Sequence, residues 1–117
     1  MALEMSAVEF DSLVERALDE IPEELARLVD NVVVLVEDEP PADDPDLLGY
    51  YEGLALTERP ANHSAALPDR ILLFRGPLLD MCADREELVE EVRITVVHEI
   101  AHHFGIDDTR LHELGYA

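Results

Sequence analysis

The feature that most constrains this chain is a long apolar pattern in its C-terminal third. Apolar side chains recur at helical spacing from Leu88 to Phe104. Asp84 is a suitable N-cap residue, and the acidic first turn that follows favours the helix dipole. Gly105 stands where a residue with a left-handed backbone commonly follows a helix. We therefore predict one long helix that begins after Asp84 and ends before Gly105.

This helix contains an H-E-x-x-H motif, His98-Glu99-Ile100-Ala101-His102. Side chains four positions apart lie on one helix face, one turn above the other, so His98 and His102 can hold one ion from a single rigid element. Glu99 projects about 100° round the helix axis from His98. It is therefore poorly placed as a third ligand, and well placed to take a proton from a water bound to the metal. We predict that Glu99 is a general base.

The residues after the motif extend it to H-E-x-x-H-x-x-G-x-x-D. Gly105 allows a sharp turn beyond the helix, and the turn can return Asp108 toward the ion. His98, His102 and Asp108 would then supply two nitrogens and one oxygen and leave a fourth position open for water. That open position distinguishes a catalytic zinc site from a structural one. We therefore predict Zn²⁺ as the cofactor, although other divalent ions also suit such ligands.

Several neighbouring residues are alternatives or accessories to this set. Asp107 could replace Asp108 if the turn differs by one residue, and His112 lies four residues past Asp108 and could replace or orient it. His103 points about 100° away from His102, so we interpret it as a neighbour of the site or a surface residue. The tyrosines are candidate donors to a developing oxyanion, or packing residues at the edge of the core; they are Tyr50, Tyr51 and Tyr116.

The rest of the chain predicts an α+β domain. With 117 residues and 48% hydrophobic content, we expect a single domain over residues 1–117. A capping box at Ser6 and Glu9 begins a helix over residues 7–19, and Pro22 suits the first turn of a second helix that reaches residue 28. Strands are expected over residues 31–37, 48–56 and 70–75, and a short final helix over residues 108–114. Gly76-Pro77 is expected to end the third strand.

The charge limits the classes of partner. The formal net charge is −20, and all the basic residues are arginine. A nucleic acid or an anionic membrane requires the opposite sign, so we expect neither as a partner. Divalent cations and basic or neutral substrates are favoured, unless the charge serves solubility alone. Cys82 is the only cysteine and no signal peptide is evident, so we expect a cytoplasmic protein. The sequence leaves the oligomeric state open.

At residues 98–108 the sequence resembles the zincin metallopeptidases, in particular their metzincin-like branch. Over nearly the whole chain it is similar to a small bacterial group of minimal zincin-fold proteins of about this length. The resemblance implies a small mixed sheet of about three strands packed on the active-site helix, with further helices N-terminal to it. It also implies zinc held by His98, His102 and Asp108, with Glu99 as general base. Metzincins usually carry histidine at the third ligand position, and a methionine turn that the residues after Asp108 lack.

Three functions follow as hypotheses. The first is zinc-dependent hydrolysis of peptide bonds in a peptide or protein substrate, which an edge strand such as residues 70–75 could hold by main-chain pairing. The second is a zinc-dependent nuclease, because the spacing His-x₃-His-x₅-Asp also resembles a family that matures ribosomal RNA. The net charge and Glu99 both argue against that hypothesis. The third is a non-catalytic module of zincin fold that binds a metal or a peptide.

Overall fold

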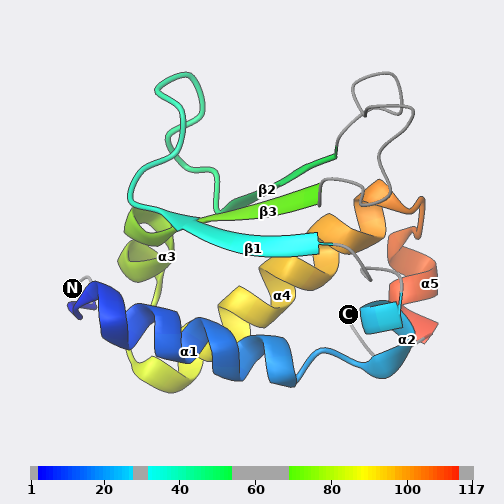
Figure 1. The fold of residues 1–117 in the computed structure, drawn as a ribbon, viewed down its shortest axis with the longest axis horizontal. Helices are drawn as coiled ribbons and strands as arrows, with labels where there is room; N and C mark the ends of the chain where they lie inside the picture. Colours follow the sequence, from blue (N-terminus) through cyan, green and yellow to red (C-terminus); the bar gives the residue numbers. More distant parts are fainter. Residues whose placement is uncertain (1–2, 28–31, 54–68, 114–117) are drawn as a thin grey trace, which may run out of the picture.

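The computed structural model describes residues 3–27, 32–53 and 69–113, apart from the side chain of Asp108. A three-stranded sheet lies over a layer of helices (Figure 1). Two long helices run beneath the sheet, α1 (Ala7–Asp19) and α4 (Arg85–His103). Two short helices lie at one end of the sheet, α2 (Glu23–Ala26) and α5 (Asp108–Glu113). A third short helix, α3 (Arg75–Met81), lies at the other end. The predicted α+β class, with a small mixed sheet on a long helix, is confirmed.

The sheet has the order β1-β3-β2, in which β1 is Val32–Glu37, β3 is Asp69–Phe74 and β2 is Gly49–Glu52. β1 is parallel to β3, and β2 is antiparallel to it. The prediction that residues 70–75 form an edge strand is therefore wrong, because β3 is the central strand. Its Ile71 and Leu73 are 1% and 0% exposed. The edge strands are β1 and β2. The residue pattern of one strand does not show which other strands flank it.

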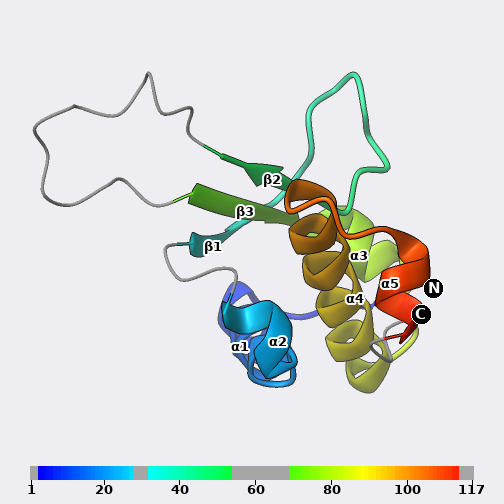
Figure 2. The same ribbon diagram turned by 90° about the vertical axis from the view of Figure 1, so that its right-hand side faces the viewer.

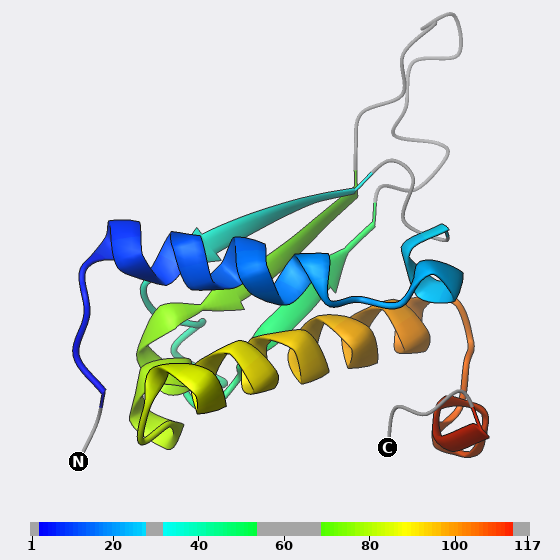
Figure 3. The ribbon, with the colours of Figure 1, turned by 90° about the horizontal axis from the view of Figure 1, so that it is seen from below.

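Both long helices begin at the caps that the sequence predicted. At α1 the Glu9 amide donates to the Ser6 hydroxyl at 3.2 Å, and at α4 the Glu87 amide donates to the Asp84 carboxylate at 2.8 Å. The helices then cross the same face of the sheet side by side (Figure 3). Their contact is extensive because α1 buries an i, i+4, i+7 stripe, namely Phe10, Val14 and Ala17.

The core lies between the sheet and the two long helices (Figure 2). α4 is the central element, because it contacts the sheet, α1, α2 and α3. A second, smaller cluster joins the C-terminal half of α4 to α2 and α5 through Leu25, Val97, Ala101 and Leu111. Enclosure on several sides explains why α4 carries apolar residues round most of its circumference. It also makes α4 a rigid platform for the side chains that it leaves uncovered.

One helix was not predicted from the sequence. Gly76-Pro77 follows the third strand as expected, but these residues lie in the first turn of α3. The first N–H groups of a helix lack partners within it, so Pro77 loses nothing there. The Gly76 amide donates to the Asp38 carbonyl at 2.9 Å, which joins the start of α3 to the end of β1. The predicted second strand is shorter than expected, since β2 ends at Glu52 and residues 54–56 lie outside the described part.

Candidate metal centre

The C-terminal half of α4 presents two adjacent rows of side chains. Thr95, Glu99 and His103 are spaced by four residues and form one row, which lies beneath β2. His98 and His102 form the second row, rotated about 60 to 100° round the axis from Glu99. The motif residues are thus divided between two surfaces of the helix, one against the sheet and one toward solvent.

The first row contacts β2 along its length. A Cβ at Gly49 would lie 2.7 Å from Thr95 Cγ2, so the strand can approach the helix this closely only with glycine there. Further along, the Tyr51 amide donates to Glu99 Oε1 at 3.0 Å. The His103 ring stacks on the Tyr51 ring, with centroids 3.9 Å apart and planes at 16°. Glu99 is therefore held in a position set by the backbone of β2.

The Tyr51 amide that Glu99 accepts from faces away from β3. In an antiparallel pair, residues alternate between those that bond across the ladder and those that point outward. The Phe74 amide donates to the Leu48 carbonyl at 3.0 Å, which marks that pair as bonded. Tyr51 lies opposite Ile71, three positions further along, and falls in the outward-pointing set. The Glu99 carboxylate thus lies at the outer edge of β2, the side on which no other strand of the described segments pairs with it.

The second row is accessible. His98 is half-buried, His102 is exposed, and neither makes a hydrogen bond or ion pair with another residue of the described segments. His102 lines an open hollow of about 360 Å³ together with Gly105, Ile106 and Asp107. His102 beside this hollow, and His98 one helical turn before it, are both available as metal ligands.

The helix ends in the sharp turn that the sequence predicted. Gly105 has φ +71°. The Ile106 amide donates to the Ala101 carbonyl at 2.8 Å and the Gly105 amide to the His102 carbonyl at 3.3 Å, which is the hydrogen-bond pattern of a Schellman motif. Ile106 then packs against the small cluster between α4 and α5. The turn leads directly into α5, of which Asp108 is the first residue.

The third ligand stays a prediction. The side chain of Asp108 lies outside the described part of the structure. Among the side chains that are described, no three from His, Cys, Asp and Glu gather closely enough to hold a metal, so neither Asp107 nor His112 completes such a group. The Asp107 carboxylate instead caps α5, where the Arg110 amide donates to its Oδ1 at 2.8 Å.

The donors that are present fit zinc. Zinc in catalytic sites is commonly held by two imidazoles and one further ligand, with a histidine pair supplied by one helix. The His98 and His102 rings are accessible and free of competing partners within the described residues. With the carboxylate of Asp108 as third donor, the set would be of nitrogen and oxygen atoms, which zinc accepts.

The structure also describes most of the other residues that the sequence singled out. Tyr51 packs on His103 and its hydroxyl donates to Asp69 Oδ2 at 2.8 Å, so His103 is a neighbour of the site through its contact with β2. Tyr50 is 50% exposed and points to the opposite face of the sheet from Tyr51. Tyr116 lies outside the described residues. Cys82 is 2% exposed, as expected of a small buried apolar residue, and burial raises the pKa of its thiol to about 11.

The Tyr51 amide contact with Glu99 was missed at the sequence level. The sequence did contain part of the signal, since Gly49 and Gly53 interrupt the predicted strand, and glycine in a strand often marks a close approach of backbone. A Cβ at Gly53 would lie 2.9 Å from His103 Cε1, so this glycine also serves the close approach to α4.

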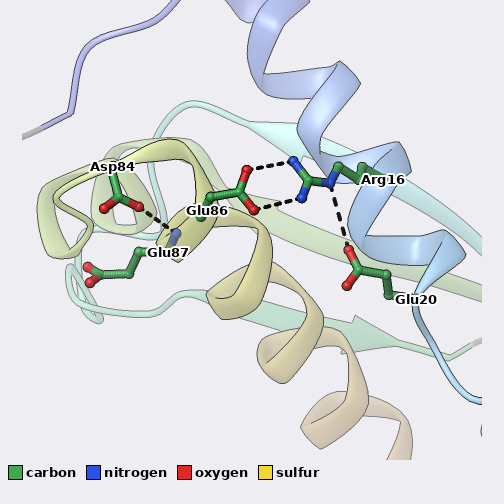
Figure 4. A network of polar contacts seen from close by, with 5 residues as sticks. All are labelled: Arg16, Glu20, Asp84, Glu86 and Glu87. Atoms are coloured by element: carbon green, nitrogen blue, oxygen red, sulfur yellow. Dashed lines mark hydrogen bonds and ion pairs between the residues drawn. The ribbon is translucent and has the colours of Figure 1, made fainter.

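Most arginines of the described segments are paired with nearby carboxylates. Arg16 lies between two glutamates, and its guanidinium donates to both oxygens of Glu86 at 2.9 and 2.7 Å (Figure 4). That contact lowers the pKa of the Glu86 carboxyl, and the pKa of Glu9 is lowered in the same way by Arg85. Across the described segments every arginine except Arg93 makes an ion pair: Arg16–Glu86, Arg27–Glu23, Arg70–Glu52, Arg75–Asp38, Arg85–Glu9 and Arg110–Glu113.

Comparisons with known proteins agree with this architecture. Residues 29–116 match the model of a family described as zincin-like metallopeptidase. A solved structure, a conserved hypothetical protein from Thermus thermophilus, is 27% identical, with a TM-score of 0.56 over 86% of this chain and 94% of that one. No curated protein matches. No helix in the described ranges is both long and apolar enough to span a membrane. Since the family match covers more than half of the chain, the protein belongs to the zincin-like metallopeptidase family.

Proposed function

We propose that the protein is a zinc-dependent peptidase in which Glu99 is the general base and His98, His102 and Asp108 hold the metal. The observation that carries the proposal is the position of the Glu99 carboxylate. It lies at the outer edge of β2 in the described sheet, on the same helix as the accessible histidine pair. Family membership supports the same reaction class.

Substrate binding would use β2 rather than β3. An extended peptide can add to a free strand edge by main-chain hydrogen bonds. The outward-facing groups of β2 include the Tyr51 amide, which Glu99 occupies in the free protein. A peptide carbonyl that paired with this amide would release the carboxylate and bring the scissile bond next to it. The high negative charge of the chain favours neutral or basic peptides.

The proposed hydrolysis requires two groups at the site, the bound metal and the Glu99 carboxylate. Bound zinc would supply Lewis acidity, which lowers the pKa of a water to about 7 and polarises the peptide carbonyl. Glu99 takes a proton from the attacking water as the new C–O bond forms. It then passes that proton to the amide nitrogen, and the C–N bond breaks to release a carboxylic acid and an amine.

The test is the Glu99→Gln variant, assayed with a mixture of quenched fluorescent peptides. The Gln side-chain carbonyl can still accept from Tyr51, so the contact with β2 survives while the proton acceptor is lost. We expect hydrolysis to fall by about 10²- to 10⁴-fold with zinc content unchanged. Glu90→Gln is the matched control, because it removes one carboxylate from an exposed position of the same helix. Hydrolysis that persists in zinc-loaded Glu99→Gln protein would refute the role of Glu99.

A further inference from the structure

The opposite edge of the sheet, β1, is unusually apolar for an exposed strand. Val32 to Val36 are all aliphatic. Natural edge strands are commonly protected from pairing with other chains by charges, proline or bulges. β1 has no such protection before Glu37, and Val33 and Leu35 are 38% and 40% exposed on its outer face. Within the described part of the chain it pairs on one side only, with β3. Its other side can accept a further strand.

A groove runs beside this edge. It lies between α1 and β1, has a volume of about 530 Å³, and is floored by apolar side chains that include Val14, Val34 and Val36. Near the start of β1 it adjoins an apolar pocket of about 190 Å³ that reaches between the sheet and α4. Leu18, Val32 and Val34 line both hollows. One large apolar side chain from a bound strand would fit this pocket.

The wall of the groove is acidic. Asp11 and Glu15 line it from α1, and neither makes a hydrogen bond or ion pair with another described residue. The nearby arginine of α1 is occupied elsewhere, since Arg16 is held by Glu86 and Glu20. The groove therefore favours an occupant that is positively charged beside Asp11 and Glu15 and apolar where it meets the floor.

We propose that β1 and this groove bind an extended, basic segment of a partner protein by strand addition. Side chains of the added strand that face α1 would include one large apolar residue in the pocket, and lysine or arginine beside Asp11 and Glu15. A second copy of this chain is a poor occupant, because each copy has a net charge of −20. The site lies across the sheet from β2 and Glu99, so it is independent of the proposed peptidase function.

The probe is an acetylated and amidated peptide, Thr-Lys-Thr-Lys-Thr-Leu-Thr-Lys-Thr, added to the full chain. We expect residues 32–37 to gain protection in hydrogen-exchange mass spectrometry when it binds. The same peptide N-methylated at its central threonine and at the adjacent leucine has equal charge but lacks amide hydrogens at two neighbouring positions, one of which must face β1, so it cannot complete the ladder. It should give no such protection. Equal binding of both peptides, or protection that avoids β1, would overturn the proposal.

The charge requirement is tested with Asp11→Asn/Glu15→Gln. Affinity for the threonine-lysine peptide should fall about fivefold, as two exposed ion pairs allow. Asp43→Asn/Asp44→Asn is the matched control, because it removes the same charge from the exposed loop between β1 and β2. An equal loss in both variants would mean non-specific attraction and would overturn the proposal. Protection, in the free chain, of the β1 amides that point away from β3 would also overturn the proposal. It would assign the edge to a second copy if it grew with concentration, and to a segment of the same chain if it did not.

Discussion

Replacing Gly49 with alanine should lower the free energy of unfolding, because the added Cβ would force β2 away from α4. The new Cβ would lie 2.7 Å from Thr95 Cγ2 and 3.1 Å from the Leu72 carbonyl oxygen. Non-bonded carbon atoms prefer separations of about 3.5 to 4.0 Å, so the strand or the helix must move by about 1 Å. Thr95 is 8% exposed, and its methyl group has no solvent into which to turn. Overpacking of this kind costs about 1 to 3 kcal/mol.

Urea denaturation of a double-mutant cycle tests this reasoning. Thr95→Ser removes the methyl group that clashes and keeps the hydroxyl, at a cost of about 1 kcal/mol for the lost apolar burial. The double variant Gly49→Ala/Thr95→Ser should be more stable than the sum of the single effects predicts, by about 0.5 to 2 kcal/mol. If the two effects add within experimental error, the contact between Gly49 and Thr95 does not set the distance between β2 and α4. The account of how β2 positions Glu99 would then lose its support.

Three further predictions concern the core and the surface. Cys82, with its pKa raised to about 11, should not react with a thiol reagent at mildly alkaline pH until the chain is unfolded, and ready reaction of the folded protein would contradict its burial. Leu88→Ala should destabilise the fold by about 2 to 5 kcal/mol in urea denaturation, because Leu88 is 0% exposed, and a loss below about 1 kcal/mol would be too small for a core position. Because the folded-state pKa of Glu86 is lowered, its pairing with Arg16 stabilises the fold above the ordinary carboxyl value of 4.5. The destabilisation caused by Arg16→Ala should therefore shrink as the pH falls through the lowered pKa, and a pH-independent effect would exclude the ion pair as its cause.

Local signals in the sequence predicted the two long helices well, whereas the second helix is shorter than expected, since α2 ends at Ala26 and Pro22 is its N-cap rather than part of its first turn. The bounds of α1 and the caps at Ser6 and Asp84 are as expected, because capping depends on residues within one turn of the helix end. The same holds for Gly105, whose positive φ ends α4 at the expected position. α3 was missed although Pro77 also suits the first turn of a helix. Gly76-Pro77 is compatible with both a turn and a helix start, and no local signal separates the two.

Relations between distant segments could not be read from the sequence. The central position of β3 depends on partners from two other regions of the chain. The hydrogen bond from Tyr51 to Glu99 joins residues 48 positions apart, and no pattern within either segment specifies it. The spacing of His98 and His102 follows from helix geometry alone, which explains why that pair could be proposed at once. Asp108 depends on the path of the chain after the turn, and its ligand role stays a prediction.

The histidine pair is tested most directly by measuring zinc in the purified protein. After equilibrium dialysis, elemental analysis should find stoichiometric zinc in the unmodified chain and in His103→Ala, whose ring stacks on Tyr51. It should find none in His98→Ala or His102→Ala, with each variant shown by circular dichroism to keep its helices. Zinc retained at full stoichiometry in folded His98→Ala/His102→Ala protein would contradict the account, and so would an unmodified chain that binds no zinc.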